Sequence, residues 1–258
     1  MTLASCAALF DLPVPVLTDK LRNDQNDFWR WWWTQFASEQ GGMRRGNLSD
    51  AFSPFRRVLN GIPVEPFLEE IEKAAENWNA ASARKKIGVQ QHTDSIMLRR
   101  PDFVPIPGED DYQVVIDIHE SQATKMADSY PKLMAYLENF SAQHGRGSLS
   151  RVVLVRLSPK KEVGPHYDNG FYYLCRDRYH LVLRSSGSKM ECAGSRSTWS
   201  PGELWWFDNN LRHSASNAGD DWRIHVIFDV LPYRNKPLVD EFKAFTRYYR
   251  QNHPELVG

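Results

Sequence analysis

The sequence contains little cysteine, no excess of charge of either sign and no long apolar run. Its three cysteines, Cys6, Cys175 and Cys192, are odd in number and widely spaced, which favours a reducing compartment over a disulfide framework. The 32 basic and 32 acidic residues cancel, so no overall field attracts a polyanion. No stretch reaches the ~18 apolar residues that a membrane helix needs. We therefore expect no nucleic-acid partner and no membrane partner.

The N-terminal sequence lacks the marks of a secretion signal. MTLASCAALFDLPVP has no basic segment before its short apolar run, so we expect no signal peptide and a cytoplasmic protein. Repeats and low-complexity tracts are also absent. At 258 residues, of which 41% are hydrophobic, the chain is long enough to bury a sizeable core. We predict one domain over residues 1–258.

Two kinds of periodicity divide the chain. Residues 63–80 and 126–142 repeat apolar side chains at three- and four-residue spacing, which predicts helices, the second with Pro131 in its first turn. From residue 150 the chain turns to short β-branched and aromatic runs separated by turn segments, which predict strands. These predicted strands are residues 151–157, 180–184, 203–207 and 224–230, with outlying strands at 95–99 and 113–118.

The order of these elements predicts the fold class. Several short strands at close spacing indicate an antiparallel sandwich or barrel. We predict a mainly β protein with flanking helices: an N-terminal helical and outlying-strand part at 1–149, a double-stranded β-helix (jelly-roll, cupin-like) core at 150–232, and a C-terminal helix within 233–258. Four of the nine tryptophans lie in residues 28–33, where core packing is favoured over a binding platform.

The segment His166-Tyr167-Asp168 and the later His213 predict a metal site. Residues i and i+2 of an extended segment point to the same side, so His166 and Asp168 can reach one ion, which His213 can join from another strand. Two histidines and one carboxylate leave open positions and are typical of non-haem Fe(II) in oxygen chemistry. A catalytic zinc site of a hydrolase is the alternative.

Arg223, directly before the predicted strand 224–230, helps to decide between Fe(II) and zinc. A buried guanidinium is costly without an anion, and its planar fork suits a carboxylate. The co-substrate 2-oxoglutarate provides such a carboxylate, whereas zinc hydrolysis does not need one. The other interpretation of Arg223 is a salt bridge to Asp220, Asp221 or Asp229.

The stretch SRVVLVRLSPKKEVGPHYDNG, followed by RDRYHLVLRS and WSPGELWWFDNNLRHSASNAGDDWRIHVIFDV, resembles the aspartyl/asparaginyl β-hydroxylase family. The resemblance covers about residues 150–232, with weaker similarity at 92–99. It implies a double-stranded β-helix and an Fe(II)- and 2-oxoglutarate-dependent dioxygenase that hydroxylates its substrate and releases succinate. In animal members that modify epidermal-growth-factor-like domains, glycine stands at the position of Asp168, so this chain looks closer to microbial members with a full triad.

The resemblance implies roles for individual residues. His166, Asp168 and His213 would bind Fe(II), and Arg223 would bind the distal carboxylate of 2-oxoglutarate. Further contacts with the co-substrate are implied for His180 and Arg178, and His225, two residues beyond Arg223, could add a hydrogen bond. Arginines considered for a substrate carboxylate are Arg99, Arg156, Arg176 and Arg178.

The substrate class stays open at this point. The resemblance implies an amino acid or an aspartyl/asparaginyl-type residue, whether free, in a peptide or carrier-bound, and a lipid acyl chain is the alternative substrate. A jelly-roll sensor that binds a metal or a small acid without catalysis is the competing function.

Overall fold

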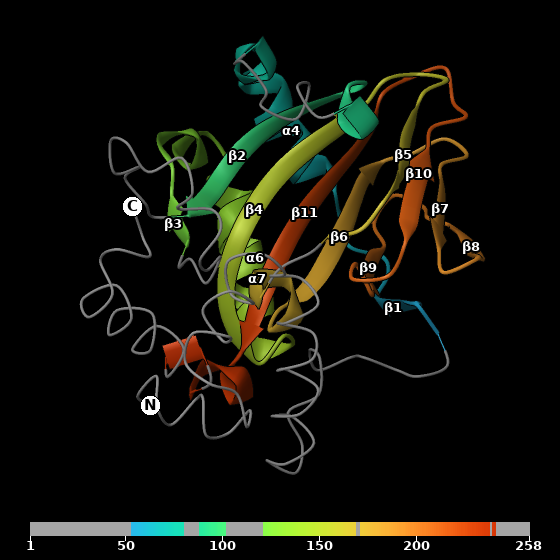
Figure 1. The fold of residues 1–258 in the computed structure, drawn as a ribbon. Helices are drawn as coiled ribbons and strands as arrows, with labels where there is room; N and C mark the ends of the chain where they lie inside the picture. Colours follow the sequence, from blue (N-terminus) through green and yellow to red (C-terminus); the bar gives the residue numbers. More distant parts are fainter. Residues whose placement is uncertain (1–52, 80–87, 102–120, 169–170, 238, 241–258) are drawn as a thin grey trace, which may run out of the picture.

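The computed structural model describes residues 53–79, 88–101, 121–168, 171–237 and 239–240. Two antiparallel sheets form the body of the described chain (Figure 1). The larger sheet has the strand order β1-β9-β6-β11-β4-β2-β3, and the smaller one β5-β10-β7-β8. The mainly β, jelly-roll fold class is therefore confirmed. The segments at 28–33 and 113–118, and nearly all of the predicted C-terminal helix, lie outside the described residues.

The larger sheet comprises β1 (Phe55–Leu59), β2 (Thr93–Pro101), β3 (Ser121–Ala123), β4 (Gly147–Leu157), β6 (Asp177–Arg184), β9 (Leu204–Phe207) and β11 (Arg223–Pro232). The smaller sheet comprises β5 (Glu162–His166), β7 (Lys189–Cys192), β8 (Ser195–Thr198) and β10 (His213–Ser216). The helices are α4 (Glu65–Lys73), α6 (Pro131–Gln143) and α7 (Phe171–Leu174). Strands predicted at 95–99, 151–157, 180–184, 203–207 and 224–230 are confirmed to within two residues at each end, except that β4 and β6 begin earlier than predicted.

The two faces of the larger sheet have different partners. Leu154, Val226 and Leu181 belong to the main buried cluster, which also includes apolar residues of α4 and α6. Phe140 of α6 packs edge-on against Phe228, with ring centroids 5.6 Å apart. Because side chains alternate along a strand, the intervening residues point to the opposite, concave face, which the smaller sheet partly covers (Figure 1). The sheet thus has one face that builds the core and one that is available for a site.

The predicted helices are shorter than their periodicity suggested. The helix predicted at 63–80 is α-helical only over Glu65–Lys73 and continues as a 3-10 turn at Ala75–Asn79. The helix predicted at 126–142 begins at Pro131, after a 3-10 turn at Lys125–Ser129. Proline disfavours a helical conformation in the preceding residue and suits the first helical position, so Pro131 starts the helix rather than lying within it. Within the described residues no helix has the length and hydropathy needed to cross a bilayer.

A buried carboxylate from α4 caps α6. The first backbone N–H groups of a helix lack partners within the helix, and the residue before α6 supplies no side-chain cap. Glu70, which is 6% exposed, accepts from the backbone N–H of Lys132 at 2.7 Å and of Leu133 at 3.1 Å. A negative charge at this helix end is also favourable. Glu70 therefore ties the two helices together beneath the sheet.

We predict that Glu70→Ala lowers the free energy of unfolding by about 2 kcal/mol, because two buried donors lose their acceptor. Urea denaturation monitored by circular dichroism measures the change. The neighbouring Glu69 pairs with Lys132 only at the exposed surface, so Glu69→Ala is the matched control and should stay within ~0.5 kcal/mol of wild type. Equal losses in the two variants would contradict the role assigned to Glu70.

Candidate metal and co-substrate site

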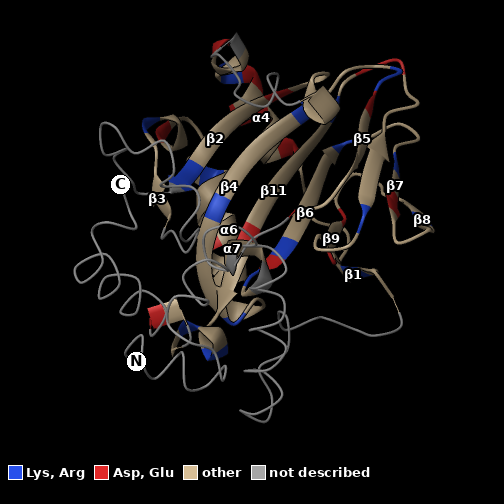
Figure 2. Ribbon diagram, viewed as in Figure 1, with Lys and Arg blue, Asp and Glu red and all other residues tan. Residues whose placement is uncertain are grey.

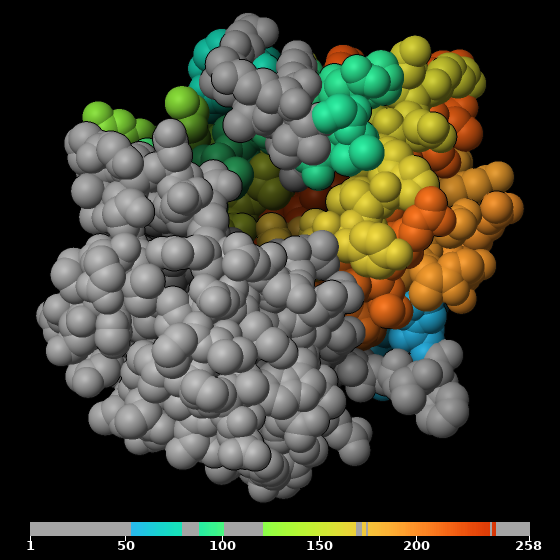
Figure 3. All heavy atoms as spheres, viewed as in Figure 1, coloured from blue at the N-terminus to red at the C-terminus, as the bar shows by residue number. Residues whose placement is uncertain are grey.

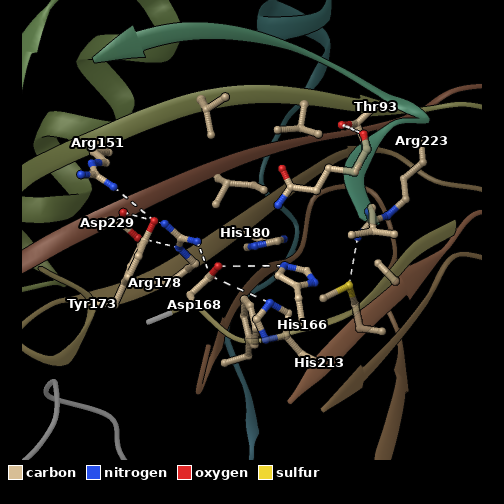
Figure 4. Close-up of a pocket in the computed structure, with 18 of the residues that line it drawn as sticks. Thr93, Arg151, His166, Asp168, Tyr173, Arg178, His180, His213, Arg223 and Asp229 are labelled. Atoms are coloured by element: carbon tan, nitrogen blue, oxygen red, sulfur yellow. Dashed lines mark hydrogen bonds and ion pairs between the residues drawn. The ribbon is translucent and has the colours of Figure 1, made fainter. Parts of the chain in front are cut away.

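The three predicted metal ligands come together at one end of the smaller sheet. His166 ends β5 and pairs in register with His213, the first residue of β10. The loop after β5 is held by the backbone N–H of Asp168, which donates to the carbonyl of Asn209 at 3.0 Å. One candidate ligand atom from each of His166, Asp168 and His213 lies within 4.8 Å of the others, and all three side chains converge in Figure 4. The three residues that the sequence pattern predicts as metal ligands therefore lie together in the structure.

Backbone carbonyls fix the tautomers of both histidines. The Nδ1 of His166 lies 2.8 Å from the carbonyl of Gly164, and the Nδ1 of His213 lies 2.8 Å from that of Leu211. A carbonyl only accepts, so each Nδ1 carries a proton, and in the neutral ring this leaves the lone pair on Nε2. These Nε2 atoms face the Asp168 carboxylate at 4.0 and 3.9 Å. Such anchoring of the distal ring nitrogen is what a metal-binding histidine needs.

The protonation states also suit a metal. Burial lowers the pKa of His213, so its ring stays neutral near pH 7. For Asp168, burial alone would raise the pKa, but Arg178, the two histidines and a hydrogen bond from Asn209 outweigh it and the pKa lies below its ordinary value. Metal ligands must be deprotonated. The ionised carboxylate of Asp168 and the neutral imidazole of His213 satisfy that condition.

Arg178 links the triad to the larger sheet. Its Nε and Nη2 donate to the two oxygens of Asp229 at 2.8 and 2.9 Å, and its Nη1 donates to Asp168. Asp229 and Arg178 are also cross-strand partners on β11 and β6. The guanidinium therefore holds the carboxylate of the triad in place. Its predicted contact with 2-oxoglutarate or substrate stays a prediction beside this observed contact.

Arg223 is buried without a carboxylate partner among the described residues. It is 6% exposed, its Nη2 lies 3.1 Å from the sulfur of Met190 and 3.1 Å from Nδ1 of His225, and its Nε makes no hydrogen bond. Burial lowers its pKa to about 9. The three aspartates considered as its partners lie elsewhere: Asp220 pairs with Lys160, Asp221 with Arg184 and Asp229 with Arg178. An anion in the cavity would offset the cost of this charge.

The triad and Arg223 line the same cavity. Its volume is about 310 Å³, and its walls include apolar residues of both sheets, among them Val153, Val155, Phe207 and Ile227. Figure 3 shows a recess in this face, with the olive and dark red of β4 and β11 visible in its floor. A volume of this size admits small molecules. The orphaned guanidinium, the polar triad and the apolar walls together fit a small dianionic co-substrate beside a divalent metal.

Two further histidines predicted to contact the co-substrate have different positions. His180 lines the cavity, and its Nδ1 lies 3.4 Å from Nδ1 of His225. His225 is 1% exposed and is not among the residues that line the cavity. Since a guanidinium only donates, Nδ1 of His225 accepts from Arg223, and burial, Arg223 and His180 hold the pKa of His225 far below its usual value. His225 thus supports Arg223 through Nδ1, and its buried Nε2 has no hydrogen-bond partner among the described residues, so the hydrogen bond from His225 to the co-substrate stays a prediction.

The predictions for two substrate arginines need correction. Arg156 donates to Asp94 at 2.8 Å and lies between the rings of Trp78 and Trp222, on the face of β4 opposite the cavity. Arg176 is buried, where it donates to Ser150 Oγ and to the carbonyl of Tyr172. Neither residue lines the cavity. The alternation of side chains along β4 explains why Arg156 points away from the cavity, because residues 151, 153 and 155 of this strand face the cavity.

Other candidate residues are placed as follows. Arg99 donates to the carbonyls of Ser150 and Ser121 and does not line the cavity. Arg151 and Tyr173 do line it, and Arg151 was missed as a site residue. Arg151 lies two and four residues before Val153 and Val155, which also line the cavity. Strand alternation from either valine therefore indicates that Arg151 faces the cavity. The sequence offered no signal for the contact of Asp229 with Arg178.

The fold and this cavity define a jelly-roll protein with a three-residue metal-type site and an adjacent buried cation. A family model described as aspartyl/asparaginyl beta-hydroxylase matches residues 68–232, and the chain belongs to that family. The match extends upstream of the predicted 150–232, as far as α4.

Relatives with similar sequences bear the same family name. The chain is 33% identical over 202 residues to the aspartyl/asparaginyl beta-hydroxylase of Mus musculus, and 23% identical over 201 residues to that of Homo sapiens. Each alignment covers 73% of this chain and 26% of the relative, so the chain spans about a quarter of the length of these curated proteins. A solved oxidoreductase of the 2OG-Fe(II) oxygenase family from Burkholderia pseudomallei aligns with a TM-score of 0.45 and 10% identity, covering 68% of this chain and 83% of that one.

We predict that Asp229→Asn weakens metal binding roughly 10- to 100-fold, because Arg178 loses the partner that fixes it against Asp168. Anaerobic calorimetric titration with Mn(II), a stable substitute for Fe(II), measures the dissociation constant. Asp220→Asn removes a surface carboxylate paired with Lys160 and controls for the change in net charge. A dissociation constant that is the same in Asp229→Asn and wild type would contradict the coupling.

Proposed function

We propose that the chain is an Fe(II)- and 2-oxoglutarate-dependent dioxygenase that hydroxylates an amino acid or an aspartyl/asparaginyl-type residue, free, in a peptide or carrier-bound. The observation that carries the proposal is Arg223, buried in the cavity of the triad with no carboxylate partner among the described residues. Family membership supports the same reaction class. A zinc hydrolase would leave this buried cation unexplained.

The residues that would bind each component follow from the geometry. His166, Asp168 and His213 would hold Fe(II) through two Nε2 atoms and a carboxylate oxygen, and Arg223 would hold the distal carboxylate of 2-oxoglutarate. When bound, this pair would activate the co-substrate dioxygen, of which one atom would be inserted into a C–H bond and the other would enter the succinate that forms, with carbon dioxide, from 2-oxoglutarate. Two histidines and a carboxylate on one face leave positions open for such chemistry.

The chain itself contributes positioning and exclusion of water. Hydrogen bonds from Nδ1 of both histidines to backbone carbonyls hold the rings, and Arg178 with Asn209 holds the Asp168 carboxylate. The valines of β4, together with Phe207 and Ile227, surround the cavity with apolar surface. A dry, preorganised site favours the target C–H bond over water as the reacting group.

We predict that His213→Ala abolishes succinate release, because the site loses one of its three ligands. Release is measured with Fe(II), ascorbate, 2-oxoglutarate and dioxygen across amino acids, peptides and extracts, with mass spectrometry for the gain of one oxygen. The exposed His144→Ala is the control and should keep wild-type turnover. Wild-type protein that binds metal and 2-oxoglutarate without any turnover would favour a sensor instead.

Arg223→Met should raise the concentration of 2-oxoglutarate needed for half-maximal turnover roughly 100-fold. It removes a charge-assisted, two-point contact worth about 3 kcal/mol, while metal affinity stays unchanged. Arg223→Lys should recover part of the loss, and Arg196→Met, at an exposed position, controls for charge. An unchanged requirement for 2-oxoglutarate in Arg223→Met would disprove this assignment.

A further inference from the structure

A second cationic group lies at the other end of the cavity from Arg223. Figure 4 shows Arg151, Tyr173, Asp229 and Arg178 on one side of the triad and Arg223 on the other. All five residues line the cavity. In Figure 2 the neighbouring strands β4, β11 and β6 carry charged positions side by side.

A β-bulge in the pairing of β4 with β11 lies beside this group. Phe228 pairs with Val152 and Val230 pairs with Leu149, so Ser150 and Arg151 together oppose the single residue Asp229. Such bulges re-aim side chains and are common beside functional sites. Ser150 accepts from Arg176, whereas Arg151 reaches the cavity, in a row with Asp229 and Arg178.

Two tyrosines hold the Arg151 guanidinium in place. It lies 3.9 Å from the ring centroid of the buried Tyr172, and its Nη1 donates to the hydroxyl of Tyr173 at 3.1 Å. Burial raises the pKa of Tyr173, so the hydroxyl keeps its proton and can donate it to a ligand. A fixed guanidinium and a phenol are two donors aimed at one region, the combination that suits an anion.

We propose that Arg151, with the hydroxyl of Tyr173, binds a carboxylate of the hydroxylation substrate on the side of the triad away from Arg223. This inference rests on the proposed function and narrows it to substrates that carry a free carboxylate. The carboxylate is either the α-carboxylate of a free amino acid or the side chain of an aspartyl residue. Arg178 serves this site indirectly, since it is bound to Asp229 and Asp168.

Binding to the Mn(II)·2-oxoglutarate complex tests the inference without turnover. One arm compares free L-amino acids with their carboxamides, and the other compares acetyl-aspartyl-amide with acetyl-asparaginyl-amide, by calorimetry and thermal shift. We expect at least one acid to bind about 10-fold or more tightly than its amide. A difference among the free amino acids would identify the α-carboxylate as the bound group, and a difference between the two acetylated amides would identify the aspartyl side chain. If no acid binds, or if the amides bind as well as the acids, the inference is wrong.

Variants then assign the effect to the subsite. Arg151→Gln should lose roughly 10-fold or more in affinity for the acid and little for the amide, with 2-oxoglutarate affinity unchanged. Arg151→Lys should keep part of the affinity, and Tyr173→Phe should lose less than Arg151→Gln. Arg196→Gln is the exposed control. Wild-type affinity for the acid in Arg151→Gln would overturn the assignment, and if that variant does not fold, full affinity in both Arg151→Lys and Tyr173→Phe would overturn it.

The two proposals fail in different ways. If wild-type protein does not bind 2-oxoglutarate in the presence of Mn(II), the proposed function itself is wrong. If 2-oxoglutarate binds in a manner that depends on Arg223 while no acid binds, only the role of Arg151 is wrong.

Discussion

The pairing of β11 between β4 and β6 is the constraint on which the candidate site depends. Alternate residues of this strand face the cavity side of the sheet, from Arg223 at one end, through His225 and Ile227, to Asp229 at the other. The opposite residues, such as Phe228, pack on α6. A shift of one residue in register would exchange the two sets. The packing of the core against the helices therefore also determines which side chains reach the cavity.

Two of the guanidiniums that line the cavity, those of Arg178 and Arg223, are in different electrostatic situations. Arg178 is bound by both oxygens of Asp229 and by Asp168, and although burial opposes its charge, these carboxylates hold its pKa well above the ordinary value. Arg223 has a thioether and an imidazole nitrogen as its described partners. The first charge is balanced within the protein and so can position a neighbour. The charge of Arg223 has no carboxylate partner among the described residues and is available to an anionic ligand. This is the reason that Arg223 is the main support for the proposed function.

Sequence patterns predict the long strands and the triad because both depend on local spacing. The runs that became β4 and β11 are rich in β-branched and aromatic residues, and the His-x-Asp segment needs only an extended backbone. Other features depend on contacts distant in sequence. The short strands β5, β7, β8 and β10 have polar sequences such as HSAS and SRST and exist through pairing with one another. The cap that Glu70 provides for α6 joins residues 62 positions apart, and the side on which Arg156 lies depends on the register of β4.

The presence of Asp168 bears on how a substrate can be recognised. Its carboxylate occupies Nη1 of Arg178, and Asp229 occupies Nε and Nη2. Each donor edge of that guanidinium is therefore committed to a protein carboxylate, so a substrate anion that approached Arg178 would have to displace one of them. Arg151, on β4 beside Asp229, lines the same cavity and lies against the ring face of Tyr172 and the hydroxyl of Tyr173. The Tyr173 hydroxyl that accepts from Arg151 can at the same time donate its own proton to an incoming carboxylate, so this pair offers a substrate two donors without displacement of Asp168 or Asp229.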